Sequence, residues 1–340
     1  MGQLLENWRN IRVGKRNIQK RGKNRRIKMN SISARICVLI TFFVTYVGIA
    51  FPQTTAKTGL SVAVSSTNIL SNGTRISATV YTPQFDDITL RLPAIAMAHG
   101  WGGKSAHLAR YASKFAAAGF LVVSFDYRGW GESDSRMVQV RSADDGQYRL
   151  IEYKGVVDPI DQAEDYFSVV NWLATHPKVD VGKIGLWGTS WSGGTVVYVA
   201  ARDSRIKALV SQVSPVGWPG SPQTSWLQIG GERARGIRGY PAPFKKEIGN
   251  LSGGMIWERL ALFNPRNDAS LLEHCASLFL VAENEELFDN SKTALVAHKR
   301  APSPTKYTVV PGATHYSIYD GASLTVAIKE AISWFEQHLN

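Results

Sequence analysis

Ser190 stands in a sequence context that could make it a nucleophile. Residues 188–194 read GTSWSGG, with an apolar stretch of strand length before them and a helix-length stretch rich in small and β-branched residues after them. A serine on a sharp strand-to-helix turn presents its hydroxyl oxygen, and small neighbours let the strand and the helix pack closely. Attack by this oxygen on a carbonyl carbon requires a base that removes the proton. The run therefore predicts acyl-transfer chemistry, with a plain strand–helix turn as the alternative.

His315 is the candidate base. It ends the run VVPGATH at residues 309–315, in a short loop after an apolar stretch near the C-terminus. Imidazole exchanges protons near neutral pH, which suits it to general base catalysis. The other six histidines lie in helical stretches or beside other elements; they are His99, His107, His176, His274, His298 and His338.

Four carboxylates follow the apolar stretch Ser277–Val281 within a few positions. The sequence there reads ENEELFD, and its acids are Glu283, Glu285, Glu286 and Asp289. An acid beside the base orients the imidazole and stabilises its charged form. No acid follows the preceding apolar stretch, Ala208–Val213. The orienting acid is therefore expected among these four residues, and Glu285 lies four positions past Val281.

Strand-length and helix-length stretches that could position these residues alternate from residue 57 to the C-terminus. The predicted strands are Ile76–Tyr81, Ala94–Ala98, Phe120–Phe125, Ile184–Trp187, Ala208–Val213, Ser277–Val281 and Tyr307–Val310. The predicted helices are Leu108–Ala118, Ala163–Leu173, Gly193–Ala201 and Ser323–Leu339. This alternation predicts the α/β class, with a mostly parallel sheet covered by helices on both faces. In such sheets, ligands bind at the carboxyl ends of the strands, where Ser190 and the four acids fall.

Two long connections interrupt the alternation. The segment from Asp134 to Val157 is polar, and we predict no regular element in it. The segment at about residues 215–273 is rich in glycine, proline and tryptophan. Because connections of this length inside a compact domain are usually functional, we interpret the second as an inserted lid over the active site.

Five motifs in chain order resemble those of the α/β-hydrolase superfamily. They are HGWGG at residues 99–103, DYRGWGES at 126–133, the GTSWSGG turn, the acids after Val281, and VVPGATH. The resemblance covers about residues 75–340, apart from the lid. It implies the α/β-hydrolase fold and the triad order Ser190, Glu285, His315. It also implies an oxyanion hole formed by the backbone N–H groups of Trp101 and Trp191. His99 and residues 126–133 are interpreted as structural.

Finer similarities point to a subgroup. Residues 157–159, the helix that follows them and the GTSWSGG turn resemble the X-prolyl peptidase and cocaine-esterase group, dienelactone-hydrolase-like enzymes and fungal polyketide transferases. The resemblance implies a serine hydrolase that cleaves an ester, thioester or amide through an acyl-enzyme intermediate. The alternatives are an acyltransferase that uses the same triad and a non-catalytic binding protein of the same fold.

The net charge of +12 belongs mostly to a leader at residues 1–56. This leader holds eleven Lys or Arg residues and one acid, whereas the rest of the chain has 28 basic and 26 acidic residues. The near balance in the rest argues against a nucleic-acid partner, which needs clustered basic residues. The expected partner is a small molecule or a short acyl or peptidyl substrate.

The leader resembles an export signal. Its apolar run, residues 36–51, is 16 residues long, shorter than the roughly 20 residues of a membrane-spanning helix. Thr54 and Ala56 then fit a signal-peptidase site, with Gly48 and Ala50 as a second option. We expect a periplasmic or secreted protein; the alternative is an uncleaved signal anchor that holds it to the membrane. A start at Met29 would leave a leader of ordinary length, so we expect residues 1–28 to be an upstream extension of the reading frame.

No spacing of His, Cys, Asp or Glu in the sequence matches a metal site, and no glycine-rich run matches a phosphate-binding or dinucleotide-binding motif. We therefore expect no metal and no cofactor. Of the two cysteines, Cys37 falls in the leader, so the exported chain would keep only Cys275 and could form no internal disulfide.

Overall fold

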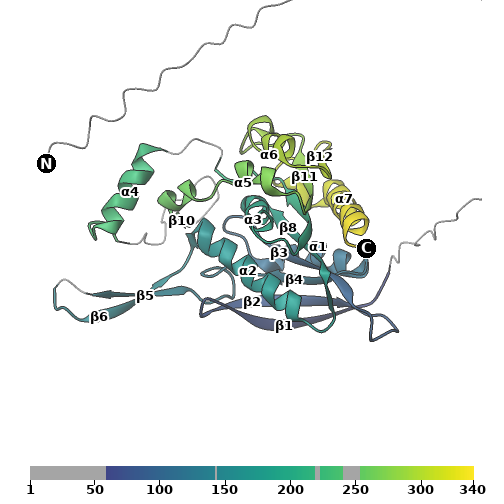
Figure 1. Ribbon diagram of the computed structural model, residues 1–340, viewed down its shortest axis with the longest axis horizontal. Coiled ribbons are helices and arrows are strands. Elements are labelled where there is room, and N and C mark those ends of the chain that lie inside the picture. Colours follow the sequence, from purple (N-terminus) through teal and green to yellow (C-terminus); the bar gives the residue numbers. More distant parts are fainter. Residues whose placement is uncertain (1–58, 142–143, 219–222, 240–252) are drawn as a thin grey trace, which may run out of the picture. The chain divides into compact units, whose positions relative to one another are not determined.

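The computed structural model describes residues 59–141, 144–218, 223–239 and 253–340 (Figure 1). The described residues all belong to one compact unit, Thr54–Asn340. The predicted leader, with its apolar run and the alternative start at Met29, therefore lies outside the described residues. Within the described ranges, no helix has the length and apolar character needed to cross a membrane.

An eight-stranded sheet forms the centre of the fold, with strand order β1-β2-β4-β3-β8-β9-β11-β12. Its strands are β1 (Val62–Ser71), β2 (Thr74–Pro83), β3 (Leu92–Ala98), β4 (Leu121–Phe125), β8 (Val179–Thr189), β9 (Ile206–Gln212), β11 (Ala276–Ala282) and β12 (Thr305–Val310). The pairs β1–β2 and β2–β4 are antiparallel, and every other pair is parallel. All seven predicted strands are present, so the mostly parallel α/β sheet is confirmed.

Helices pack on both faces of this sheet. The main ones are α1 (Ala109–Ala117), α2 (Pro159–Thr175), α3 (Trp191–Ala200), α6 (Ala294–Arg300) and α7 (Gly321–Leu339). Apolar residues of α1 and α7 share one buried cluster with side chains from one face of the sheet. Residues of α2, α3 and α6 share a second cluster with the opposite face. Successive side chains of a strand point to opposite faces, which explains why the central strands are apolar along their whole length.

The connection from Asp134 to Val157 contains regular structure that the sequence analysis did not predict. Strands β5 (Arg136–Arg141) and β6 (Tyr148–Tyr153) form an antiparallel hairpin, and β7 (Val156–Val157) follows. Most side chains of the hairpin are exposed. A hairpin that buries little has no strict apolar–polar alternation, so its sequence resembles a polar loop.

The segment predicted as a lid is structured where it is described. It contains α4 (Thr224–Ala234), β10 (Gly254–Met255), η2 (Trp257–Ala261), α5 (Pro265–Asp268) and η3 (Ala269–Leu271). Strand β10 pairs in parallel with β7. Three further short helices are η1 (Ser105–Leu108), η4 (Asn290–Lys292) and η5 (Ser317–Tyr319). The role of the segment as a lid stays a prediction.

Candidate active site

Ser190 occupies a strained turn between β8 and α3. Its φ is 53° and its ψ is −123°, a conformation that residues with a side chain rarely adopt. Such strain costs on the order of 1–3 kcal/mol and persists only where the surroundings enforce it. Here the backbone N–H of Ser190 donates to the carbonyl oxygen of Gln212 at 2.8 Å, and Gly193 N–H donates to the carbonyl of Ser190 at 3.0 Å. The turn is therefore held from both sides.

Glycine is required at two positions next to this turn. A Cβ atom on Gly188 would lie 2.3 Å from the carbonyl oxygen of Ser192, so β8 could not approach α3 with a larger residue there. A Cβ on Gly100 would lie 2.8 Å from the Cβ of Ser190, so the loop 99–103 reaches the serine only because residue 100 is glycine. These contacts bring the two glycine-containing motifs together.

Ser192 stands where the usual motif has glycine, and the structure accommodates its side chain. The residue is fully buried, and its hydroxyl lies 2.8 Å from the Tyr127 hydroxyl and 2.9 Å from the Tyr166 hydroxyl. The oxygen of Ser192 is thus engaged behind the turn. Of the two serines, Ser190 is the one whose side chain meets a histidine.

The side chains of Ser190, His315 and Glu285 form a continuous chain of hydrogen bonds. His315 Nε2 lies 3.0 Å from Ser190 Oγ, and His315 Nδ1 lies 3.0 Å from each carboxylate oxygen of Glu285. The side chains of His315 and Glu285 are 5% and 2% exposed. Because a carboxylate can only accept, Nδ1 carries the proton and Nε2 is left to accept from the serine.

The other three acids of this loop have different partners. Glu283 accepts a hydrogen bond from the backbone N–H of Gly312 at 2.7 Å, and Asp289 accepts one from Ser291 N–H at 2.8 Å at the start of η4. Glu286 accepts from the backbone N–H of His315 at 2.6 Å. Although burial opposes its charge, this bond helps to lower the pKa of Glu286. Among the four candidates, Glu285 is the acid that meets the imidazole.

Trp101 and Trp191 both lie near Ser190. Trp191 follows it in the chain, and Trp101 follows Gly100, which approaches the serine closely. Trp191 is the first residue of α3, where backbone N–H groups have no acceptor within the helix. Its ring meets that of Trp101 edge-on at 5.7 Å and stacks on Phe263 at 5.5 Å. Its indole Nε1–H donates to Gln162 Oε1 at 2.8 Å. The two residues predicted to supply the oxyanion hole are thus brought together, and their ring positions depend on each other.

His99 supports the loop that carries Trp101. It is 2% exposed, its Nε2 accepts from Tyr127 N–H at 3.4 Å, and its Nδ1 donates to the carbonyl of Gly100 at 2.8 Å. Burial lowers the pKa of His99, which keeps the ring neutral. These contacts fit the structural role expected from the sequence.

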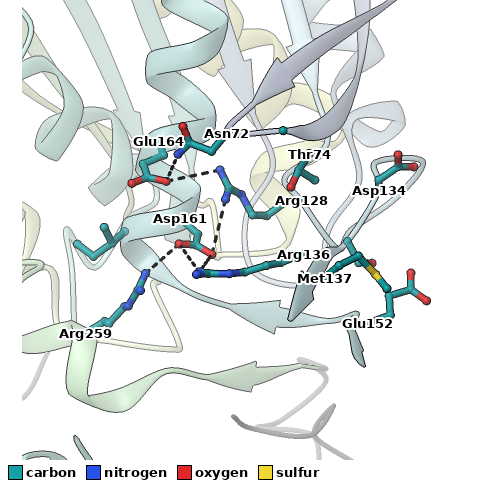
Figure 2. A pocket seen from close by; sticks show the side chains of 13 residues that line it. Asn72, Thr74, Arg128, Asp134, Arg136, Met137, Glu152, Asp161, Glu164 and Arg259 are labelled. Atoms are coloured by element: carbon teal, nitrogen blue, oxygen red, sulfur yellow. Dashed lines mark hydrogen bonds and ion pairs between the residues drawn. The ribbon is translucent and has the colours of Figure 1, made fainter. Parts of the chain in front are cut away.

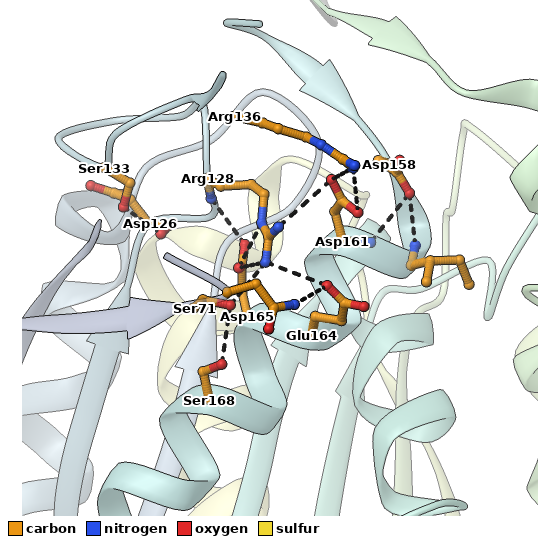
Figure 3. A network of polar contacts seen from close by, with 12 residues as sticks. Ser71, Asp126, Arg128, Ser133, Arg136, Asp158, Asp161, Glu164, Asp165 and Ser168 are labelled. Carbon is orange, nitrogen blue, oxygen red and sulfur yellow. Dashed lines mark hydrogen bonds and ion pairs between the residues drawn. The ribbon is translucent and has the colours of Figure 1, made fainter. Parts of the chain in front are cut away.

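The run at residues 126–133 forms a buried polar network (Figure 3). The Asp126 carboxylate accepts from the backbone N–H groups of Ser105 at 2.6 Å and Glu132 at 3.0 Å. Arg128 binds Asp165 of α2 through Nε at 2.8 Å and Nη2 at 2.6 Å. None of these contacts involves Ser190, Glu285 or His315, which fits the structural interpretation of the run.

A polar cavity of about 720 Å³ lies beside this network, and its lining does not include Ser190, Glu285 or His315. Figure 2 shows Arg136 of the hairpin and Arg259 of η2 converging on Asp161 of α2. Arg259 Nη1 lies 2.9 Å from both Asp158 and Asp161, so it connects the segment 215–273 to the first turn of α2. The described residues contain no group of three or more His, Cys, Asp or Glu side chains able to hold a metal ion.

The sequence analysis missed several residues that support the site. Gln162, Asp165 and Tyr166 all come from α2, and their partners lie far away in sequence. Their polar character on an otherwise apolar helix face was the available signal. The contact between the hydroxyl groups of Thr189 and Tyr319, at 2.6 Å, could not be predicted from the sequence pattern.

Known proteins match this chain over part of its length. Residues 72–226, less than half of the chain, match the family described as X-Pro dipeptidyl-peptidase (S15 family). An uncharacterized 31.7 kDa protein from the traX-finO intergenic region of Escherichia coli is 38% identical over 126 residues, which cover 37% of this chain and 38% of that protein. The quorum-quenching protein AidA of Acinetobacter baumannii is 34% identical over 143 residues, covering 42% and 41%. The chain therefore spans well under half the length of these two relatives.

A solved structure shares the fold over nearly its whole length. The α/β hydrolase GrgF from Penicillium sp. sh18 superposes with a TM-score of 0.63 at 18% identity, covering 82% of this chain and 99% of that one. A curated sequence named polyketide transferase grgF is 28% identical over 172 residues, covering 48% of this chain and 53% of that protein. With its mostly parallel eight-stranded sheet, the chain has the fold of the α/β hydrolases.

Proposed function

We propose that this protein is a serine hydrolase that cleaves an ester, a thioester or an amide through an acyl-enzyme intermediate. Ser190 is the nucleophile, His315 the general base and Glu285 the orienting acid. The observation that supports this most directly is the chain of hydrogen bonds from Ser190 Oγ through both nitrogens of His315 to Glu285. The strained backbone of Ser190, which such a turn requires, supports it independently.

The proposed reaction has two steps. His315 Nε2 takes the hydroxyl proton as Ser190 Oγ attacks the substrate carbonyl carbon, and the protonated imidazole then gives this proton to the departing alcohol, thiol or amine. In the second step water attacks the acyl carbon and gives a proton to His315. The imidazolium then returns this proton to Ser190 Oγ as the acyl–oxygen bond breaks and the carboxylic acid leaves. Glu285 stays ionised and stabilises the charge of the imidazolium.

The carbonyl oxygen becomes negatively charged at each attack and needs donors that are already in place. We assign this role to the backbone N–H groups of Trp101 and Trp191. The start of α3 at Trp191 and the close approach of Gly100 to Ser190 support the assignment. No metal or cofactor takes part in the proposed steps.

An active-site probe tests this proposal. A fluorophosphonate should modify Ser190 of the purified protein, and peptide mapping should find the label there. Ser190→Ala should remove both the label and the hydrolysis of a panel of ester, thioester and prolyl-amide substrates. A label on Ser192 would show that the nucleophile is misassigned. No label and no turnover would favour a non-catalytic binding protein of the same fold.

Acyl transfer is a second candidate, favoured by the likeness to the protein named polyketide transferase grgF. The acyl-enzyme would form in the same way, and an alcohol or an amine would replace water in the second step. Product analysis with a labelled ester and added alcohol or amine acceptors separates the two reactions. A product that carries the acyl group on the acceptor, at the expense of free acid, would favour the transferase.

We further propose that part of the segment 215–273 forms a wall or lid of the substrate site. Phe263 stacks on Trp191, and a Cβ on Gly194 of α3 would lie 2.7 Å from the backbone nitrogen of Gly217. Phe263→Ala should therefore change the ratio of kcat/KM for esters with an aryl acyl group to kcat/KM for esters with an acetyl group. An unchanged ratio would place the segment away from the substrate.

We also propose export, with removal of the leader near Ala56. The basic residues, the short apolar run and the small residues after it support this. N-terminal sequencing of natively secreted protein should begin just past Ala56. An intact N-terminus recovered in a membrane fraction would instead favour an uncleaved anchor at residues 36–51.

A further inference from the structure

A closed ring of buried hydrogen bonds lies directly behind the turn that carries Ser190. The hydroxyl groups of Thr189 and Tyr319 are 2.6 Å apart. Gln212 Nε2 donates to Thr189 Oγ1 at 3.3 Å and to the Tyr111 hydroxyl at 2.9 Å. Tyr111 donates to the carbonyl oxygen of Ile318 at 3.1 Å, and Ile318 adjoins Tyr319, which closes the ring.

The ring joins four elements that meet only in the folded chain. Tyr111 belongs to α1, Thr189 ends β8, Gln212 ends β9, and Ile318 and Tyr319 belong to η5. Tyr111, Thr189, Gln212 and Ile318 are each at most 2% exposed. Burial raises the pKa of both tyrosine hydroxyls, which keeps them protonated and able to donate.

The side-chain amide of Gln212 has one orientation that satisfies the ring. Tyr111 uses its only proton on Ile318, so it can only accept from Gln212, and the amide nitrogen must face it. Within the described residues, Gln212 Oε1 is then buried without a hydrogen-bond partner. A buried acceptor without a partner costs free energy. Here this cost is accepted in an orientation that lets the amide nitrogen donate two hydrogen bonds.

Both ends of the ring connect to the reacting side chains through short stretches of backbone. The backbone carbonyl oxygen of Gln212 accepts a hydrogen bond from the N–H of Ser190, the residue next to Thr189. On the other side, His315 lies in a turn closed by Thr314 and Ser317: each backbone N–H donates to the other's side-chain oxygen, at 2.8 and 3.1 Å. The carbonyl of Thr314 also accepts from Ile318 N–H at 3.3 Å. Residues 318 and 319 therefore link the loop that carries His315 to the turn that carries Ser190.

We propose that Tyr319 is a positioning residue that, through Thr189, keeps His315 Nε2 at hydrogen-bond distance from Ser190 Oγ. The inference rests on the proposed function of Ser190 and His315. Among the described residues, the Tyr319 hydroxyl bonds Thr189 and makes no hydrogen bond to Ser190 or His315, so it acts on them through the ring. Because small displacements of aligned reacting groups are costly in rate, removing one hydroxyl should slow the chemical step by about 10-fold.

Four variants test the ring, each measured by the rate of fluorophosphonate labelling and by kcat and KM on a chromogenic ester. Tyr319→Phe and Thr189→Val each remove one hydroxyl of the shared bond and should lower the labelling rate and kcat about 10-fold, with KM little changed. The double variant should be no slower than Thr189→Val, since the bond between residues 189 and 319 is already lost in each single variant and the bond from Gln212 is already lost in Thr189→Val. Thr189→Ser keeps the hydroxyl and should retain the rate.

Tyr307→Phe is the matched control, because it removes a tyrosine hydroxyl from β12, outside the ring, and should react like the wild type. A variant that is only destabilised loses labelling amplitude in proportion to its unfolded fraction, while its folded fraction reacts at the normal rate. Tyr319→Phe with a wild-type labelling rate, or a double variant slowed by the product of the single effects, would overturn the inference. A wild-type protein that is not labelled at Ser190 would instead overturn the proposed function itself.

Discussion

Replacement of Glu285 by glutamine tests the acid of the proposed triad. In the structure both carboxylate oxygens lie 3.0 Å from His315 Nδ1, and one of them also accepts from Leu287 N–H at 3.1 Å. An amide of the same shape offers one oxygen and one NH₂ group. If the NH₂ group faces the ring, Nδ1 must accept and the ring proton moves to Nε2, which can then no longer take the proton of Ser190.

The expected loss follows from this change of tautomer. Exchange of the acid for its amide lowers kcat by about 10⁴-fold in the well-studied serine protease triad. At about 1.4 kcal/mol per tenfold change, that corresponds to roughly 5.5 kcal/mol of transition-state stabilisation. The fold should survive, since only one oxygen is replaced. The assay is kcat on a chromogenic ester, with circular dichroism to check folding.

The neighbouring acids provide matched controls. Glu283→Gln and Asp289→Asn should keep nearly normal kcat, because their carboxylates bind only backbone or loop groups away from the imidazole. Glu286→Gln should have a small effect, since an amide oxygen can still accept from His315 N–H. A nearly normal kcat for Glu285→Gln with a collapse in one control would assign the acid to that neighbour. Nearly normal rates in all four would leave a Ser–His dyad.

Three further predictions concern the support of the site. Gly188→Ala should prevent stable folding, because its Cβ would lie 2.3 Å from Ser192 O; a thermal transition like that of the wild type would contradict this. Arg128→Met should lower the free energy of unfolding by about 3–5 kcal/mol, since it leaves the fully buried Asp165 carboxylate unpaired. Urea titration measures it, and a change below 1 kcal/mol, roughly the value of a surface pair, would argue against the ion pair. Cys275 should resist iodoacetamide in the native protein, because burial raises the pKa of its thiol, and should react in urea; peptide mapping that found native alkylation would refute this.

The sheet was predictable because its central strands are buried on both faces. A strand such as β11 has seven buried residues in a row and appears in the sequence as an uninterrupted apolar run. Strand β1 was missed because it pairs on one side only and most of its residues are exposed or partly exposed, so polar side chains break its pattern. Helix α6 was missed because it is only seven residues long and ends in three basic residues.

The candidate site was predictable only where one short segment carries a complete signal. The turn around Ser190 and the loop ending in His315 each combine an apolar strand with characteristic residues, and the structure brings both together. The acid lacked such a signal, because four carboxylates lie within seven positions and three of them have partners about 30 residues away. Contacts of Gln162, Tyr166 and Tyr319 depend on the packing of separate elements, which residue patterns do not report.

The bridge from Arg259 to the first turn of α2 has an evolutionary consequence. Asp158 and Asp161 hold this arginine, and the next residue, Gln162, holds the indole of Trp191. One helical turn therefore binds both Arg259 of the segment 215–273 and the indole of Trp191, the residue next to Ser190. The effects of substitutions at positions joined through one hydrogen-bonded network do not add in general. Evolutionary substitution of Arg259 should therefore restrict which residues are tolerated at position 162. The two positions should then change together across related chains.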